Sequence, residues 1–114
     1  MQRLLLGAAL TVISLGALGA ELAGKVVAIA DGDTLTILDR NDRQHRIRLA
    51  AIDASERGQP HWKASKQFLA DRAFSQWVSV KYGKADRYGR LVGRVLRDGQ
   101  GINLEMVLGG AAGI

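Results

Sequence analysis

The stretch 31–56 constrains this chain more than any other, because two groups of charged residues enclose a predicted hairpin. The residues between them, 35–47, form two segments in which polar and apolar side chains alternate, joined by a polar turn. Such alternation is typical of strands with one buried face. A hairpin of this length is expected to bring Asp33 back near Arg48 and Asp53. Carboxylates and a guanidinium group in one place suit a hard divalent cation together with an anionic substrate.

The first twenty residues have the organisation of a secretory signal peptide. Arg3 precedes an uncharged apolar run from Leu4 to Leu18, and small residues surround the end of that run. The run is short for a transmembrane helix, which needs about 20 apolar residues. We therefore expect residues 1–20 to direct export to the periplasm or the extracellular space. Retention of the segment as an N-terminal membrane anchor is the alternative.

Residues 21–114 are expected to form a single domain, because the length suits one small fold and not two. The whole chain carries 16 Lys and Arg against 11 Asp and Glu, a net charge of +5, and removal of the signal peptide takes away only Arg3. A basic surface on a small exported domain suits a polyanion such as nucleic acid. The chain has no cysteine, so the domain does not use disulfide bonds.

Periodicity and turn signals predict five strands and two helices. The expected strands are 22–30, 34–38, 44–52, 78–82 and 91–96, and the expected helices are 61–75 and 102–108. Asn103 is expected to cap the second helix. Trp62 and Trp77 are interpreted as core or barrel-lid residues rather than as platforms for stacking bases. This order of elements indicates an α+β fold, mainly β, in which a small barrel carries helices; the OB-fold is the common five-stranded example.

Four motifs occur in succession along the chain. They are Asp31-Gly32-Asp33-Thr34, then Ile47-Arg48-Leu49 with Ile52-Asp53-Ala54-Ser55-Glu56, then Asp86-Arg87-Tyr88-Gly89-Arg90, and finally Asn103. In this order and with these gaps they resemble the staphylococcal-nuclease-like family, also called thermonucleases. The resemblance covers about residues 24–112. It implies an OB-fold barrel and calcium-dependent hydrolysis of DNA and RNA that leaves 3′-phosphate ends.

The chemistry of phosphodiester hydrolysis explains the acidic positions. The phosphodiester repels hydroxide, and its transition state gathers further negative charge that a divalent cation can meet. Calcium prefers oxygen ligands, so Asp33 and Asp53 are the expected metal carboxylates. The resemblance adds the backbone carbonyl of Ala54 as a third ligand. Mn²⁺ and Mg²⁺ are alternatives for such an all-oxygen site.

The resemblance also assigns roles in binding and catalysis. Arg48 and Arg90 would hold the scissile phosphate, which guanidinium groups can grip in a bidentate way. Glu56 would orient or deprotonate the attacking water. Arg87 and Tyr88 would contact a neighbouring phosphate or a base of the bound nucleotide.

Each motif also has an ordinary structural interpretation when it is taken alone. Asp31 and Asp33 are common turn formers beside a glycine, and Arg48 suits a solvated strand position. Glu56 suits a loop, and residues 86–90 suit a solvated turn before a strand. For the chain not to be a nuclease, all of these structural interpretations would have to be correct at once. The combination of motifs therefore favours the nuclease. The alternative function is a non-catalytic nucleic-acid-binding OB-fold module or an inactive truncated nuclease.

Two departures from the family pattern affect the expectation. Many relatives have proline at the position of Ser55, so the loop that carries Glu56 is expected to be less rigid. Relatives also continue into a final helix where this chain has the glycine-rich sequence 109–114, so the family's third helix is expected to be missing. We therefore expect a marginally stable monomer whose substrates are DNA and RNA. It is expected to contact no membrane unless its N-terminal segment is retained.

Overall fold

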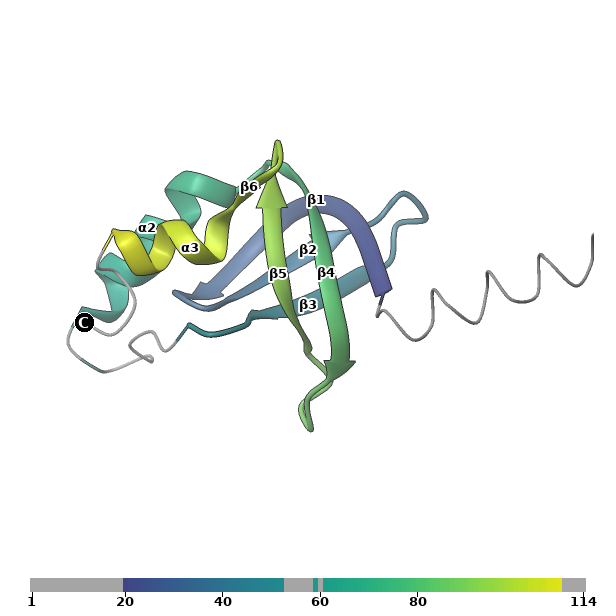
Figure 1. The fold of residues 1–114 in the computed structure, drawn as a ribbon, viewed down its shortest axis with the longest axis horizontal. Coiled ribbons are helices and arrows are strands. Elements are labelled where there is room, and N and C mark those ends of the chain that lie inside the picture. Colours follow the sequence, from purple (N-terminus) through teal and green to yellow (C-terminus); the bar gives the residue numbers. More distant parts are fainter. Residues whose placement is uncertain (1–19, 53–58, 60, 110–114) are drawn as a thin grey trace, which may run out of the picture.

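The computed structural model describes residues 20–52, 59 and 61–109, which form a small barrel with two helices at one end (Figure 1). The elements are β1 (Ala20–Asp31), β2 (Thr34–Leu38), β3 (Gln44–Leu49), α2 (Trp62–Ala73), β4 (Trp77–Ala85), β5 (Leu91–Arg97), β6 (Gln100–Gly101) and α3 (Ile102–Leu108). The strand order is β3-β2-β1-β4-β5-β6, and β3 also pairs in parallel with β5. The sheet therefore closes on itself, which confirms the predicted five-stranded OB-fold barrel with two helices; β6 is a two-residue addition that the sequence did not indicate.

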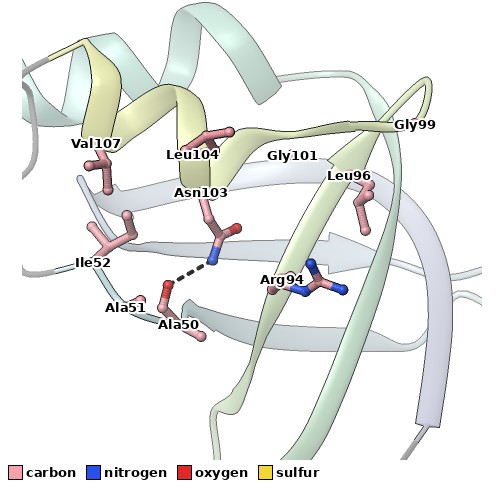
Figure 2. Close-up of a pocket in the computed structure, with 10 residues that line it drawn as sticks. All are labelled: Ala50, Ala51, Ile52, Arg94, Leu96, Gly99, Gly101, Asn103, Leu104 and Val107. Carbon is pink, nitrogen blue, oxygen red and sulfur yellow. Dashed lines mark hydrogen bonds between the residues drawn. The ribbon is translucent and has the colours of Figure 1, made fainter.

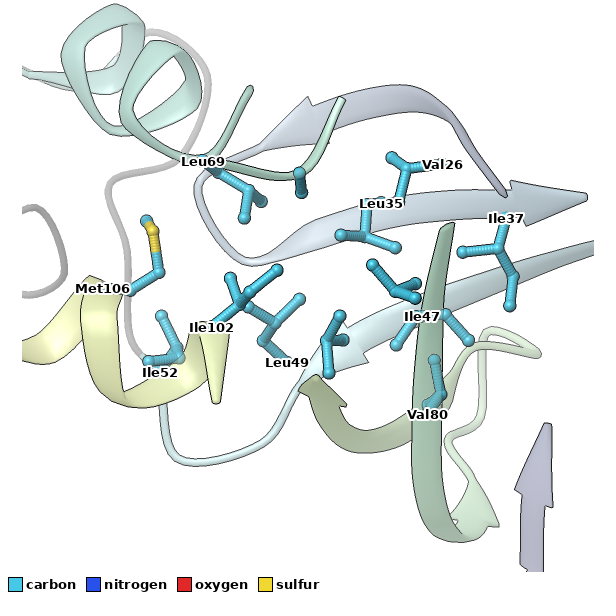
Figure 3. Close-up of a cluster of buried hydrophobic side chains, with 13 residues drawn as sticks. Val26, Leu35, Ile37, Ile47, Leu49, Ile52, Leu69, Val80, Ile102 and Met106 are labelled. Carbon is cyan, nitrogen blue, oxygen red and sulfur yellow. The ribbon is translucent and has the colours of Figure 1, made fainter. Parts of the chain in front are cut away.

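Alternating side chains build the barrel core. Ile37 of β2 and Ile47 of β3 are completely buried, while the residues next to them in sequence are not. Burying one such side chain stabilises the fold by about 1.5–3 kcal/mol. Figure 3 shows the core, whose labelled members are Val26, Leu35, Ile37, Ile47, Leu49, Ile52, Leu69, Val80, Ile102 and Met106.

The barrel closes at Gly93, in the middle of β5. Gly93 pairs with Leu49 of β3 on one side and with Tyr82 of β4 on the other. A Cβ at this position would lie 2.6 Å from the carbonyl oxygen of Lys81, so a larger residue cannot occupy it without moving the backbone. The Gly93 carbonyl accepts a hydrogen bond from the Ala50 N–H at 2.8 Å, which continues the closure beyond the end of β3.

The two helices cover one end of the barrel and contact each other (Figure 1). α2 packs against β1 through Leu69 and Ala73, and α3 packs against β5. Ile102 and Met106 are the buried hydrophobic residues of α3. Among the residues that the structure describes, neither helix has the length and apolar character that crossing a membrane requires.

Further details differ from the sequence prediction, and β4 extends to Ala85 rather than ending at Tyr82. β3 ends at Leu49 rather than at Ile52, because Ala51 adopts a left-handed backbone conformation with φ 62° that a strand cannot contain. Asn103 does not cap α3; the N-cap is Gly101, and Asn103 is buried. Trp77 is 45% exposed, so its interpretation as a core or lid residue is wrong.

The predicted signal peptide falls almost entirely outside the described residues. Its last residue, Ala20, is the first residue of β1 and pairs with Tyr82 of β4. The signal peptide, export and the anchor alternative therefore stay predictions.

Candidate active site

The turn between β1 and β2 positions Asp33. The Asp33 N–H donates to Asp31 Oδ1 at 3.1 Å, so Asp31 forms the turn, as an Asp beside a glycine often does. The Asp33 carbonyl accepts from the Leu49 N–H at 2.8 Å, which ties the turn to the end of β3. The Asp33 side chain is held in a buried position, with 8% of the residue exposed.

Four side chains from three parts of the chain form one polar network around Asp33. Arg48 Nη2 lies 3.2 Å from Asp33 Oδ2 and also donates to the Ile52 carbonyl at 3.2 Å. The Thr34 hydroxyl lies 3.0 Å from Asp33 Oδ1 as a donor, and its oxygen accepts from Arg90 Nη1 at 3.4 Å. The network brings the predicted metal ligand Asp33 together with both predicted phosphate-binding arginines.

The environment of Asp33 disfavours its ionised form. Burial is the largest cause, and the hydrogen bond and negative charge of Asp31 add to it, so that the pKa of Asp33 rises to about 6. The Thr34 hydroxyl and Arg48 act in the opposite direction but do not outweigh these effects. A buried carboxylate beside a second carboxylate gains from a bound cation, and oxygen ligands suit a hard one. The described part of the site therefore offers a cation one carboxylate ligand, Asp33.

The loop between β4 and β5 positions Arg90 through Asp86. Asp86 Oδ1 accepts from the Tyr88 N–H at 2.9 Å and the Arg90 N–H at 3.0 Å, and Asp86 Oδ2 accepts from Arg90 Nε at 2.8 Å. Desolvation raises the pKa of Asp86, but the hydrogen bonds from Arg90 and Tyr88 outweigh it and hold that pKa below its usual value. Asp86 thus fixes both the loop backbone and the direction of the Arg90 guanidinium.

The same loop presents Tyr88, which is 57% exposed. The guanidinium carbons of Arg87 and Arg90 lie 5.0 Å and 5.4 Å from the centre of its ring, and Arg87 Nη2 donates to the Tyr88 hydroxyl at 2.9 Å. Arg46 of β3 donates to the Tyr88 carbonyl, so β3 anchors the loop. An aromatic ring between two guanidinium groups can contact a base and its phosphates together.

Sequence reasoning quoted Thr34 and Asp86 within motifs but gave them no role, and it gave none to Arg46. The four-residue spacing of Asp86 and Arg90 is a recognisable ion-pair signal. Arg46 occupies the same face of β3 as Arg48, two residues away, which is the period of a strand. These three residues hold the predicted site residues in place.

Asp53, Ala54 and Glu56 lie outside the described residues, so their predicted roles stay predictions. Within the ranges 20–52, 59 and 61–109, no cluster of three acidic, histidine or cysteine side chains is arranged to hold a metal ion. Ile52, the last described residue before this segment, is joined to Arg48 through its carbonyl. The chain therefore enters the undescribed segment directly beside the Asp33 network.

A cavity of about 490 Å³ lies between β5, α3 and residues 50–52 (Figure 2). It is lined by Ala50, Ala51, Ile52, Arg94, Leu96, Gly99, Gly101, Asn103, Leu104 and Val107. None of the predicted site residues that the structure describes lines it. Figure 2 shows the Asn103 side chain reaching across to the Ala50 carbonyl, a hydrogen bond of 2.8 Å.

Comparison with known sequences identifies the family. The profile of the family described as staphylococcal nuclease homologue matches residues 46–114, which is more than half of the chain. The chain belongs to this family. The match begins at Arg46 and includes Arg48 and the loop 86–90.

Curated relatives agree with this assignment. An "Uncharacterized endonuclease" of Escherichia coli is 38% identical over 104 residues, which are 90% of this chain and 67% of that protein. A "Micrococcal nuclease" of Shigella flexneri is 47% identical over 76 residues, 67% of this chain and 43% of that protein. A "Thermonuclease" of Staphylococcus intermedius is 30% identical over 95 residues, 76% of this chain and 56% of that protein. The chain therefore spans between about two fifths and two thirds of these proteins, and it is similar to hydrolases that cleave nucleic acids.

Proposed function

We propose that the protein is a calcium-dependent nuclease that hydrolyses phosphodiester bonds of DNA and RNA and leaves 3′-phosphate ends. The observation that supports the proposal is the network in which Asp33, Thr34, Arg48 and Arg90 converge. A carboxylate that suits a cation lies beside two guanidinium groups that suit a phosphate, and family membership makes the phosphodiester the natural substrate.

The residues of the chain divide the work of hydrolysis. Arg48 and Arg90 bind the scissile phosphate and offset the charge that its oxygens gain in the transition state. Arg87 and Tyr88 bind the adjoining nucleotide, and Glu56 orients the attacking water and accepts its proton. Asp33, Asp53 and the Ala54 carbonyl would hold Ca²⁺, which when bound polarises the phosphoryl oxygens as a Lewis acid. Asp86 and Arg46 keep Arg90 and the loop in place while substrate enters.

The test is a cleavage assay on single-stranded DNA with the full chain, in calcium and in a calcium chelator. Glu56→Ala and Arg90→Ala are the site variants, and Lys63→Ala, at an exposed position of α2, is the matched control for surface charge. Circular dichroism and urea unfolding establish that every variant is folded. Calcium-dependent cleavage that both site variants lose and the control keeps supports the proposal. A folded protein that binds DNA without cleaving it would instead identify a nucleic-acid-binding module.

We also propose that the protein is exported and acts as a monomer. The composition of residues 1–20 supports export. N-terminal sequencing of protein recovered from the periplasm or medium tests this. An intact Met1 on membrane-bound protein would support the anchor alternative instead.

A further inference from the structure

We propose that the outer face of β1, β2 and β3 continues the substrate site, and that Trp77 and Arg40 form a second nucleotide subsite at its far end. The inference rests on the proposed function, because the strand that occupies this subsite is the same nucleic acid whose phosphodiester lies at Arg48 and Arg90. The occupant is an unpaired nucleic-acid strand.

The strand register connects the two sites by a path across β3, β2, β1 and β4 on the outer surface of the barrel. At the catalytic end, Arg48, Thr34 and Asp31 pair across β3, β2 and β1. Four residues further along β3, a second row crosses the sheet and reaches β4. This second row, called here the remote row, consists of Gln44, Leu38, Lys25 and Trp77.

All members of the remote row face outward. Val26, Ile37 and Val78, which neighbour Lys25, Leu38 and Trp77 in sequence, are buried in the core. Because side chains alternate along a strand, the members of the remote row point away from the core. Between the two rows lie Thr36 and Arg46, which pair with each other. Arg46 therefore supplies a cation along the path.

Trp77 has the features of a stacking platform. Trp77 is 45% exposed although its side chain is large and mostly apolar. The guanidinium carbon of Arg40, in the turn between β2 and β3, lies 5.1 Å from the centre of its ring. A planar guanidinium group held against an indole can stack with a base and pair with a phosphate at once. The aromatic surface and the positive charge are therefore already together.

The charges around Trp77 favour an anionic strand. Lys25 is exposed and is the cross-strand partner of Trp77. Asp39, the acid next to Arg40, is already engaged, because its carboxylate lies 2.8 Å from His45 Nε2 and accepts the N–H groups of Asn41 and Arg43. The two acids of the turn are matched by Arg40 and Arg43, so Lys25 leaves the surroundings of Trp77 with a small net positive charge.

The separation of the two sites matches the length of a bound strand. Four residues along β3 and three steps between strands give a path of roughly 20 Å around the barrel surface from Arg48 to Trp77. OB-fold proteins bind about 4–16 nucleotides of single strand, so one strand can occupy both sites. Stacking on Trp77 has no base preference, because every base has a π face. The subsite is therefore expected to favour longer unpaired strands without selecting their sequence.

The experiment measures affinity as a function of strand length. Fluorescence anisotropy in chelator, where cleavage does not occur, compares the full chain with Trp77→Ala and Arg40→Ala on labelled oligodeoxynucleotides of about 12 and about 3 nucleotides. Trp77→Phe keeps an aromatic ring, and Lys63→Ala removes a cation elsewhere on the surface. Circular dichroism verifies that each variant is folded. Because the substituted residues are exposed, we expect the substitutions to leave the fold intact.

We expect Trp77→Ala to weaken binding of the longer strand about tenfold and Arg40→Ala to weaken it several-fold. Trp77→Phe is expected to stay near wild type, and the difference between wild type and Trp77→Ala is expected to disappear with the short strand. An RNA of the same sequence should behave in the same way. Equal affinities of wild type and Trp77→Ala for the longer strand overturn the inference, as does an equal loss with Lys63→Ala.

Cleavage of the short strand in calcium separates this inference from the proposed function. If wild type cleaves it and Trp77→Ala leaves affinity for the longer strand unchanged, the subsite is refuted and the nuclease stands. If wild type binds the longer strand through Trp77 but cleaves neither strand, the subsite stands as part of a binding module and the nuclease is refuted.

Discussion

At the scale of single residues, Asp33 shows stability and function in opposition. Its carboxylate is buried beside Asp31, and its pKa of about 6 means that the folded protein holds the ionised form at a cost when no cation is bound. A residue chosen for stability alone would be neutral at this position. The cost is understandable if the carboxylate serves a cation, because perturbed pKa values gather where chemistry occurs.

Asp33→Asn is therefore expected to separate the two effects. Without calcium, the variant should be more stable at neutral pH by about 1–2 kcal/mol, since it no longer buries a negative charge. Arg48 loses the charge of its carboxylate partner but keeps the Ile52 carbonyl and is partly exposed. We expect calcium to raise the melting temperature of wild type but not of the variant, and cleavage by the variant should fall by at least about 100-fold. Thermal unfolding in chelator and in calcium measures both effects; an unchanged response to calcium contradicts the role of Asp33.

At the scale of elements, local pattern predicts strands well and their ends less well. The alternation in β2 and β3 reflects a physical constraint, one face in the core and one in water, so the sequence records it directly. The end of β3 is different. Ala51 fits the alternation, but the chain turns there with a positive φ, a conformation that the surroundings impose and that alanine does not signal.

The loop 86–90 is a second element whose behaviour depends on one residue. Asp86→Ala removes all three hydrogen bonds to the loop and should lower kcat/KM by about 10- to 100-fold, because Arg90 is no longer held in a productive position. Stability should change little, since the residue lies near the surface.

Asp86→Asn is the matched variant. It can keep an oxygen acceptor for the N–H groups of Tyr88 and Arg90 but loses the charge that pairs with Arg90 Nε, so its activity should lie between wild type and Asp86→Ala. Steady-state kinetics on single-stranded DNA, with urea unfolding of the same samples, measures both quantities. Wild-type activity in Asp86→Ala would refute a positioning role.

The turn between β2 and β3 gives a prediction for pH. The pKa of Asp39 is lowered by its hydrogen bond with His45 and by the Arg43 and Asn41 N–H groups. Its stabilising contribution is therefore present above the ordinary carboxyl pKa and is lost as pH falls through the lowered value. Asp39→Asn should be less stable than wild type at neutral pH, and the two should converge below about pH 4. Urea midpoints from pH 7 to pH 3 measure this; a constant difference across that range contradicts it.

At the scale of the whole molecule, the site is assembled from segments that only the closed barrel brings together. Arg90 reaches Thr34 across 56 positions of sequence because β3 pairs with β5. The motifs predicted which residues meet but not which contacts hold them. Trp77 shows the same limit, since an isolated tryptophan in a strand favours the core, and only its place at the outer face of β4 leaves it exposed.

Asn103 is the residue through which α3 completes the barrel, and the prediction that it caps the helix failed for that reason. Its Oδ1 accepts from the Val95 N–H at 2.9 Å, and its Nδ2 donates to the carbonyls of Ala50 at 2.8 Å and Gly93 at 3.2 Å. Asparagine favours helix N-caps locally, but these partners lie on β5 and beyond the end of β3. No local pattern records them.

Asn103→Ala should therefore destabilise the whole fold rather than the helix alone. It leaves the Val95 N–H buried without its acceptor and frees the Ala50 carbonyl, so the free energy of unfolding should fall by about 2–4 kcal/mol. That is a large part of the 5–15 kcal/mol typical of such domains. Leu104→Ala, one residue away and 60% exposed, is the control and should change stability by less than about 1 kcal/mol. Urea unfolding measures the stability of both variants. Because α3 bridges β5 to the segment that leads into the Asp33 network, Asn103→Ala should lose cleavage activity at the urea concentration where it unfolds. Equal stability of the two variants would mean that the three hydrogen bonds do not hold the barrel closed.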